Sequence, residues 1–502
     1  MCVAVLVWAA APPPDASPAA AVSRELDDPK ARESRGEVII DADEAPRPGD
    51  ESGRPVHGLA RVGVGFGAVM QDVVAVVHPS LELDFSELAP VRLRFGAPIR
   101  LRMIPRAPDQ RGVVRNADWD EAGDAVAVLE RLDYADQFAL AQGGHAAVDL
   151  HTGRLRGLSF GHGSLLRHHD NSLDVDRRRT GIDVSTEVTG EMLEQPASFE
   201  ADLAVTDLAG SQLLGARVGG RWAGAGLGFS AIGDPNAPRQ LQQTADPDPR
   251  FTRQAGGTLV PVDRKGAAGL ALELSYLATD RWWWSVEPYL DLVALPGLGR
   301  GLHLGAEADF VAGARRRTRL GATAELTVSN RSYDPAYFDV FYLAERWLVP
   351  PVGVPDDRPV DHTTVAQPKW AFVRDEDLAG AGGSGSLWMA HDVGVFAETG
   401  YQMRPGPRGH TWHLRGGLDL AAVQLSCLVA NRGRHGFVPK RAGSLAELDV
   451  RVPVLEWMDA FGTIGWLAAI RADPTAPPGG EATGLVTGAG YVVAGVGGRV
   501  PW

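Results

Sequence analysis

Histidine and carboxylate side chains gather in one short stretch of the chain, "GHGSLLRHHDNSLDVD" at positions 161–176. Imidazole and carboxylate groups together suit a borderline divalent ion such as zinc, provided that they converge. The candidate ligands are His162, His168 and Asp170. Their spacing matches no regular metal-binding motif, so the alternative is a polar loop or a polar patch lining a water-filled interior. We therefore expect neither a metal nor any other cofactor.

The same stretch contains Ser164, which with His162 and Asp170 would supply the side chains of a nucleophilic triad. Ser164 in "GHGSL" and Ser384 in "GGSGS" lack the G-x-S-x-G spacing of serine hydrolases. "GVGFGA" at positions 63–68 has the spacing of a dinucleotide fingerprint. The residues after it read as another strand, however, whereas the fingerprint requires a helix. We expect no enzyme, and a hydrolase ranks third among the functions considered below.

The most regular charged motif is "PVRLRFGAPIRLRMI" at positions 90–104. Every odd position from 91 to 103 is apolar, and four even positions carry arginine: Arg92, Arg94, Arg100 and Arg102. Because successive side chains of a strand point to opposite faces, this strand has one apolar and one cationic face. The arginines either attract a permeating anion, as basic rings do in pores, or form salt bridges that make the wall rigid.

The preceding segment, 73–85, alternates in the same way and ends in a short turn. The resulting hairpin places Asp84 opposite Arg92 and Glu82 opposite Arg94, and each such pair contributes about 0.2–1 kcal/mol. The same register puts valines opposite the two outer arginines, which therefore need partners elsewhere. These six charged residues are our candidates for lining the interior.

Alternation of this kind recurs from Gly58 to the carboxyl end and indicates roughly 16 to 20 strands. In a soluble sandwich the apolar faces would pack inward, whereas in an outer-membrane barrel they would meet lipid and the charges would line the lumen. The segment from Val91 to Met103 would run about 43 Å, or about 30 Å along the membrane normal at a 45° tilt. Soluble strands usually stop at about five or six residues, so strand length favours the barrel.

Composition excludes several classes of protein. The chain has 502 residues and a formal net charge of −14, which disfavours a nucleic-acid partner. Its two cysteines, Cys2 and Cys427, cannot make a disulfide framework. No run approaches the ~18 apolar residues of a membrane-spanning helix. Tryptophans near predicted strand ends, among them Trp222, residues 282–284 and Trp457, suggest an interfacial girdle.

The chain divides into three parts by composition. Residues 1–21 have the apolar run and small-residue cleavage sites of a signal peptide, although a basic start is missing and the start site is open to question. Residues 22–56 read as a flexible periplasmic tail. Residues 57–502 form the barrel, with long loops near 104–125, 162–178, 233–266 and 331–384. The last loop is rich in aromatics that we consider gate candidates: Tyr337, Phe338, Phe341, Tyr342 and Trp347. It either folds into the lumen or caps the outer mouth.

The carboxyl end, "YVVAGVGGRVPW", resembles the terminal strand by which outer-membrane barrels of Gram-negative bacteria are recognised for assembly. Trp502 would be the assembly signal, although the usual terminal residue is Phe and the penultimate Pro501 is also a departure. A wider resemblance, through "DWDEAGDAVAVLERLDY", "LSFGHGSLLRHHDNSLDVDRRRTG" and "YFDVFYLAERW", is to uncharacterised porin-like barrels of the same bacteria. It implies the outer membrane as location, with lipid and the barrel-assembly machinery as partners.

We predict an all-β protein, a single large antiparallel transmembrane barrel of about 18 strands, within a range of roughly 14 to 20. Its leading function is a passive channel for small polar solutes, gated by the aromatic loop. The alternative is a plugged structural or adhesive barrel whose external loops bind a partner. Neither the solute nor the oligomeric state follows from the sequence.

Overall fold

The structure is a computed structural model, and every structural statement below concerns the part of the chain that it describes. The described residues are 56–69, 72–105, 112–115, 118–119, 122–140, 144–173, 179–210, 212–244, 258–263, 265–281, 283–312, 318–346, 363–365, 367–375, 377–391, 393–405, 409–420, 423–432, 443–472 and 483–501. The predicted signal peptide, nearly all of the predicted tail, Trp347 and Trp502 lie outside these ranges.

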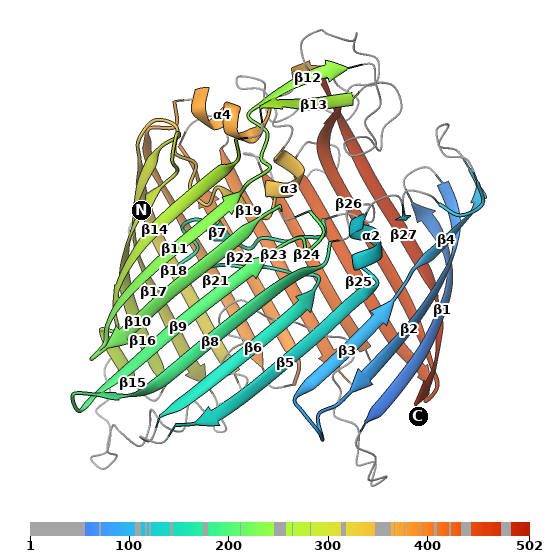
Figure 1. The fold of residues 1–502 in the computed structure, drawn as a ribbon, viewed down its shortest axis with the longest axis horizontal. Coiled ribbons are helices and arrows are strands. Elements are labelled where there is room, and N and C mark those ends of the chain that lie inside the picture. Colours follow the sequence, from blue (N-terminus) through green and yellow to red (C-terminus); the bar gives the residue numbers. More distant parts are fainter. Residues whose placement is uncertain are drawn as a thin grey trace.

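Antiparallel strands form the wall of a barrel (Figure 1). In the first half these are β1 (His57–Val69), β2 (Asp72–Asp84), β3 (Val91–Gly96), β4 (Ile99–Ile104), β5 (Leu129–Ala139), β6 (His145–Gly153), β8 (Gly181–Met192), β9 (Gln195–Val205), β10 (Leu214–Trp222) and β11 (Ala225–Asp234). In the second half they are β14 (Ala267–Tyr276), β15 (Thr279–Arg281), β16 (Trp284–Ala294), β17 (Arg300–Ala312), β18 (Thr318–Ser329), β21 (Gly380–His391), β22 (Val395–Met403), β23 (His410–Leu420), β24 (Val423–Arg432), β25 (Ser444–Leu455), β26 (Met458–Ala472) and β27 (Thr483–Pro501). Neighbours in the wall are neighbours along the chain, except that β3 and β4 both pair with β2, and β14 and β15 both pair with β16.

The wall closes because β27 pairs with β1 from Leu59↔Pro501 to Val69↔Tyr491. Within the described residues the wall has 20 strand positions, because β3 and β4 together occupy one position and β14 and β15 together occupy another. This number is at the upper end of the predicted range. The predicted continuous strand 91–103 is interrupted at Ala97 and Pro98, where the proline ring has no N–H to donate to the ladder.

The two rims of the barrel differ in the length of their connections. At one rim the strands are joined by short turns such as 85–90, 193–194, 223–224 and 456–457, and the described chain starts and ends there, at residues 56 and 501. The longest connections, 105–128, 154–180, 235–266 and 330–379, all belong to the other rim, which is uppermost in Figure 1. This asymmetry is typical of outer-membrane barrels.

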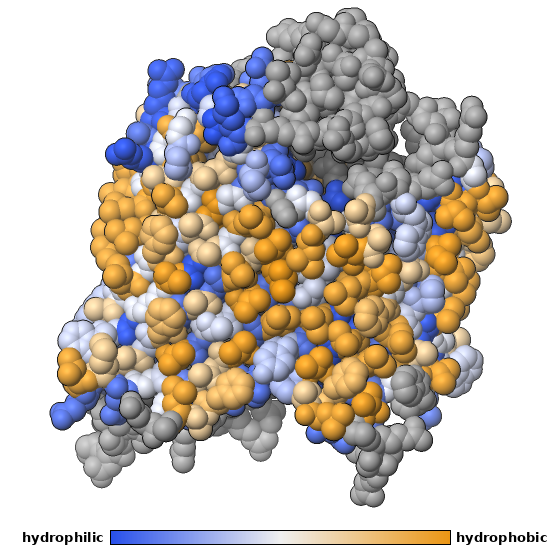
Figure 2. All heavy atoms as spheres, in the orientation of Figure 1, coloured by the Kyte–Doolittle hydropathy of each residue, from blue (hydrophilic) through white to orange (hydrophobic). Residues whose placement is uncertain are grey.

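Side chains alternate between an apolar outer surface and a charged interior. On β14, Leu272 and Leu274 are each 39% exposed, while Glu273 between them is 3% exposed. On the predicted strand, Phe95 is 38% exposed and Arg102 is 6% exposed. Figure 2 shows apolar residues covering the wall on the face in view. A soluble sandwich would have the reverse orientation, so that alternative is wrong.

Shorter elements lie inside the barrel or at its long-loop rim. They are α2 (Ala122–Val126), β7 (Leu166–Arg167), β12 (Gln240–Thr244), β13 (Thr258–Asp263), β19 (Phe338–Asp339), α3 (Tyr342–Glu345), β20 (Thr363–Val365) and α4 (Lys369–Asp375). β7 and β19 pair with each other in parallel, inside the wall (Figure 1). Among the described residues, no helix is both long and apolar enough to cross a membrane.

Candidate functional site

The predicted hairpin has the expected register. Asp84 is opposite Arg92 and Glu82 is opposite Arg94. The ion pairs differ in part from the register: Arg92 Nε lies 3.3 Å from Asp84 Oδ2, whereas Arg94 Nε lies 3.2 Å from Glu130 Oε2 on β5. The predicted partner of Arg94, Glu82, lies 3.7 Å from an Arg61 nitrogen. These ion pairs therefore connect four strands, β1, β2, β3 and β5, a network that the register of one hairpin does not show.

The two outer arginines face valines across the hairpin and find carboxylates elsewhere. Arg102 Nε donates to Asp72 Oδ2 at 2.9 Å, and both side chains are almost fully buried. Arg100 Nη1 donates at 2.9 Å to Asp118, a residue of the connection between β4 and β5. These contacts support the interpretation that the outer arginines make the wall rigid.

Residues 154–173, which we call the inner segment, fold into the barrel and contact its far wall. Arg154 donates to both oxygens of Glu447 on β25, each at 2.5 Å, although the two residues are 293 apart in sequence. Arg156 Nη2 reaches Glu447 at 2.8 Å and Asp449 at 3.3 Å. Charge-assisted bidentate pairs of this kind fix geometry as well as contribute energy. They anchor the start of the inner segment across the lumen.

The tip of the inner segment contacts the opposite group of strands. His162 Nδ1 lies 2.9 Å from Asp291 on β16, and its ring stacks on Tyr289 at 3.8 Å between centroids. Gly161 makes the close approach possible, because it has φ +51° and a Cβ there would lie 2.3 Å from the Glu273 carboxylate. Burial lowers the pKa of His162, but the hydrogen bond and charge of Asp291 outweigh it, so the net change is upward.

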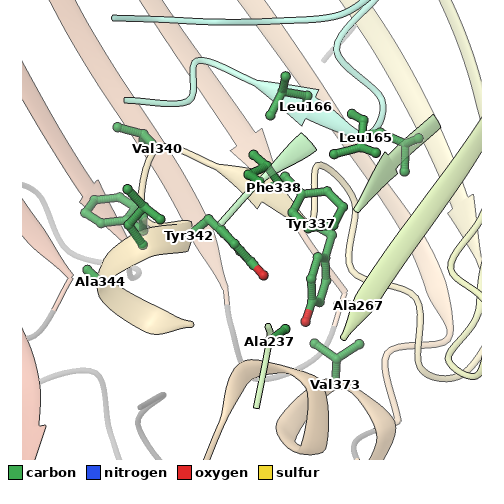
Figure 3. Close-up of a cluster of buried hydrophobic side chains, with 14 of the residues drawn as sticks. Leu165, Leu166, Ala237, Ala267, Tyr337, Phe338, Val340, Tyr342, Ala344 and Val373 are labelled. Atoms are coloured by element: carbon green, nitrogen blue, oxygen red, sulfur yellow. The ribbon is translucent and has the colours of Figure 1, made fainter. Parts of the chain in front are cut away.

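Four of the five predicted gate residues lie in a second inward fold, residues 332–346, which we call the aromatic segment; the fifth, Trp347, is outside the described residues. Tyr337, Phe338, Phe341 and Tyr342 are each at most 1% exposed. They share one apolar core with Leu165 and Leu166 of the inner segment, as Figure 3 shows for several of them. Of the two predicted placements, the aromatic segment therefore adopts the one inside the barrel.

Charged contacts hold the aromatic segment to the wall near the long-loop rim. Asp339 accepts hydrogen bonds from Arg404, at 2.7 Å, and from Arg432, at the ends of β22 and β24. Tyr342 Oη donates to Asp234 at the end of β11, at 2.8 Å. The buried Lys369 of α4 donates to the Tyr337 carbonyl at 2.5 Å. The aromatic segment thus joins strand ends on opposite sides of the lumen.

The two folded segments leave a cavity of about 990 Å³ against β1–β6, β8 and β22–β27. Its lining includes the predicted residues Arg92, Arg94 and Arg100. The other lining arginines are Arg61, Arg131, Arg154, Arg156, Arg179, Arg415 and Arg451, and the lining carboxylates are Glu130, Asp133, Asp149, Asp170, Asp183, Glu447, Asp449 and Asp459. A space lined by charges of both signs is suited to a small, hydrated polar or ionic solute.

The three predicted metal ligands contact different partners. His162 contacts Asp291, and Asp170 accepts from Arg154 at 3.3 Å. His168 is instead placed beside Glu398 and His413, two wall residues that the motif search did not find. Both lie at inward positions of the alternating pattern of their strands, and that pattern is the signal that could have found them. Burial lowers the pKa of His168 to about 3, and that of the neighbouring His169 to about 4.

The serines of the inner segment have structural contacts. The backbone carbonyl of Ser164 accepts the Ala336 N–H at 3.1 Å, which joins the inner and aromatic segments. Ser159 in "GLSFG" has the G-x-S-x-G spacing, which the sequence analysis missed. Its hydroxyl accepts the His168 N–H at 2.9 Å, and the described residues around it form no strand-to-helix turn.

No family model matches the chain, and no curated protein matches it. Among solved structures it is similar to Pseudomonas aeruginosa OccK11 (OpdR), with 10% identity and a TM-score of 0.32 over 89% of this chain and 96% of that one. It is also similar to a Rhodopseudomonas blastica porin, with 9% identity and a TM-score of 0.25 over 89% of this chain and 99% of that one. A third similar structure is the Pseudomonas aeruginosa ferric enterobactin receptor, with 10% identity and a TM-score of 0.33 over 89% of this chain and 82% of that one.

Proposed function

We propose that this protein is a bacterial outer-membrane barrel that conducts small polar solutes passively through its lumen. The observation that carries the proposal is the cavity of about 990 Å³, bounded by the wall and the inner segment and lined by charges of both signs. A structural barrel has no need to keep such a space polar and open to water. The inner and aromatic segments narrow the lumen and set which solutes pass.

The outer surface supports insertion into a lipid bilayer. At the middle of the sheet, Val64 of β1 lies between Val77 and Val496 of its neighbours, and Val64 and Val496 are 45% and 49% exposed. The 13 residues of β1 run about 43 Å, which a 45° tilt reduces to about 30 Å. Exposed Trp222 and Trp457 lie at the short-turn rim, where an interfacial girdle would hold them.

The asymmetry of the rims gives the orientation. Outer-membrane barrels have short periplasmic turns and longer external loops. We therefore place the short-turn rim, with residues 56 and 501, in the periplasm and the aromatic segment near the external mouth. Membrane lipid and the barrel-assembly machinery are the proposed partners, with β27 and Trp502 as the assembly signal. Replacement of Trp502 by Ala should lower the amount of barrel in the outer membrane, and an unchanged amount would remove that assignment.

A plugged structural or adhesive barrel is the second candidate function. The observation in its favour is the density of the interior core, in which Tyr333, Phe338 and Phe341 are completely buried. If the inner segment seals the lumen, the long loops would carry the function by binding a partner. The two functions make opposite predictions for ion conductance.

Planar-bilayer recording of the purified full-length protein tests the proposal. We expect discrete conductance steps from preparations that show a heat-dependent shift on a gel, which demonstrates a folded barrel. Folded protein that inserts without any steps would refute the channel and favour the plugged barrel. Recovery of the mature chain in the periplasmic fraction, without a heat-dependent shift, would refute membrane insertion.

A further inference from the structure

Three potential ligands for a metal ion meet where the inner segment touches the wall. They are His168 of the inner segment, Glu398 of β22 and His413 of β23, and their ligand atoms all lie within 4.8 Å of one another. This is the one such group among the residues that the structure describes. His168 and His413 also line the cavity.

The distances fit a transition-metal ion. His168 Nε2 and His413 Nε2 lie 3.2 Å and 3.3 Å from the same oxygen, Glu398 Oε1. With zinc–ligand bonds of about 2.0–2.2 Å, the edges of a tetrahedral site are about 3.4 Å long. Two edges are therefore already close to the required length, and the third, between the two imidazole nitrogens, is at most 4.8 Å and shortens when an ion binds. The cavity side is left for water or a solute as the fourth ligand.

The surrounding chain builds this arrangement. Gly400, opposite His413, has no side chain, and a Cβ there would lie 2.2 Å from the His413 ring. His168 is held at φ +52°, which is unusual for a residue with a side chain. Its Nδ1 atom is buried without a hydrogen-bond partner, which is rare for a buried polar atom. Backbone conformations of this strained kind cluster at functional positions.

The charges around the cluster set the strength of binding. Arg415 Nη1 donates to the other oxygen of Glu398 at 3.3 Å, which leaves Oε1 to face the imidazoles. Two imidazoles and one carboxylate suit zinc and similar borderline ions better than magnesium or calcium. Because Arg415 offsets the carboxylate charge, we expect weaker binding than at structural zinc sites.

We propose that His168, Glu398 and His413 form a site for a divalent transition-metal ion, of which zinc is the test case, inside the lumen. A bound ion joins the inner segment to β22 and β23. The sequence predicts no metal, and of its candidate ligands only His168 belongs to this site, since His162 and Asp170 contact other partners.

Zinc titration of the metal-stripped full-length barrel in detergent micelles, followed by calorimetry, tests the site. We expect one zinc ion per chain. His413→Ala and Glu398→Gln should each weaken binding at least about tenfold, the low end of the cost of perturbing a metal's ligand environment. Gly400→Ala should also weaken it, because it displaces the His413 ring without removing a ligand. The matched control is His410→Ala on the same strand, since His410 contacts Tyr401 away from the cluster.

A cobalt titration gives an independent signal, because cobalt bound by imidazole nitrogens absorbs visible light. That absorption should be present in the His410→Ala variant and lost in the His413→Ala variant. Equal zinc affinity in the native chain and in the His413→Ala and Glu398→Gln variants would overturn the proposal, as would the absence of binding by folded native protein. If one variant fails the heat-shift test of folding, the others decide. None of these measurements depends on conductance, so the proposed metal site and the proposed channel function can be refuted independently of each other.

Discussion

Replacement of Val64 by Arg tests which face of the wall meets lipid. Val64 is seven residues from the start of β1 and five from its end, or about 16 Å and 12 Å along the normal at a 45° tilt. Its side chain, 45% exposed, therefore lies within a few ångströms of the bilayer midplane. An outward arginine at that depth costs about 2–4 kcal/mol of folding free energy, a roughly 30- to 700-fold shift in the equilibrium.

Ser185→Arg is the matched control, because it introduces the same side chain on the inner face. Ser185 lines the cavity on β8 and lies opposite two carboxylate residues, Asp149 and Asp202. The new guanidinium would stay hydrated beside two carboxylates, so we expect a change within about 0.5 kcal/mol. Reversible denaturant titration in phospholipid vesicles, followed by tryptophan fluorescence, measures both variants. A loss for Val64→Arg no larger than that for Ser185→Arg would refute the orientation.

Three further predictions concern the segments inside the barrel. Glu447→Gln should weaken the contact that anchors Arg154 by about 1–3 kcal/mol, a figure reduced because the arginine is partly exposed. The loosened inner segment should raise single-channel conductance. An unchanged conductance would mean that this anchor does not limit the pore. Because the pKa of His162 is raised by Asp291, its stabilising contact is complete below the ordinary pKa of 6.5 and is lost as the pH rises through the higher folded value. Protease cleavage of the inner segment should therefore increase with pH, and a pH-independent rate would contradict this. Phe338→Ala should destabilise the aromatic segment by about 3–5 kcal/mol, seen as faster proteolysis of that segment in an otherwise heat-shifted barrel, whereas unchanged proteolysis would show that the core does not hold it.

The alternation of side chains predicted the strands, because a strand buried on one face must separate apolar from charged residues with a period of two. The length of the strands then favoured a barrel over a sandwich. The register of the hairpin β2–β3 followed from the same rule, since a slip of one residue would turn the Arg92 and Arg94 side chains outward. The number of strands followed only approximately. Pro98 divides one predicted strand into two, and the alternation by itself does not show that both pieces occupy one position in the wall.

Contacts across the lumen could not be read from the sequence. The partners of Arg154 and His168 lie on distant strands, and only the closure of the barrel brings them together. The candidate ligands of the motif at positions 161–176 are close in sequence but diverge in the folded loop, because each side chain meets a different partner. Local periodicity thus determined the orientation of every strand, whereas the tertiary structure decided which inward-facing charges meet, since that depends on closure and on the path of two inward-folded segments.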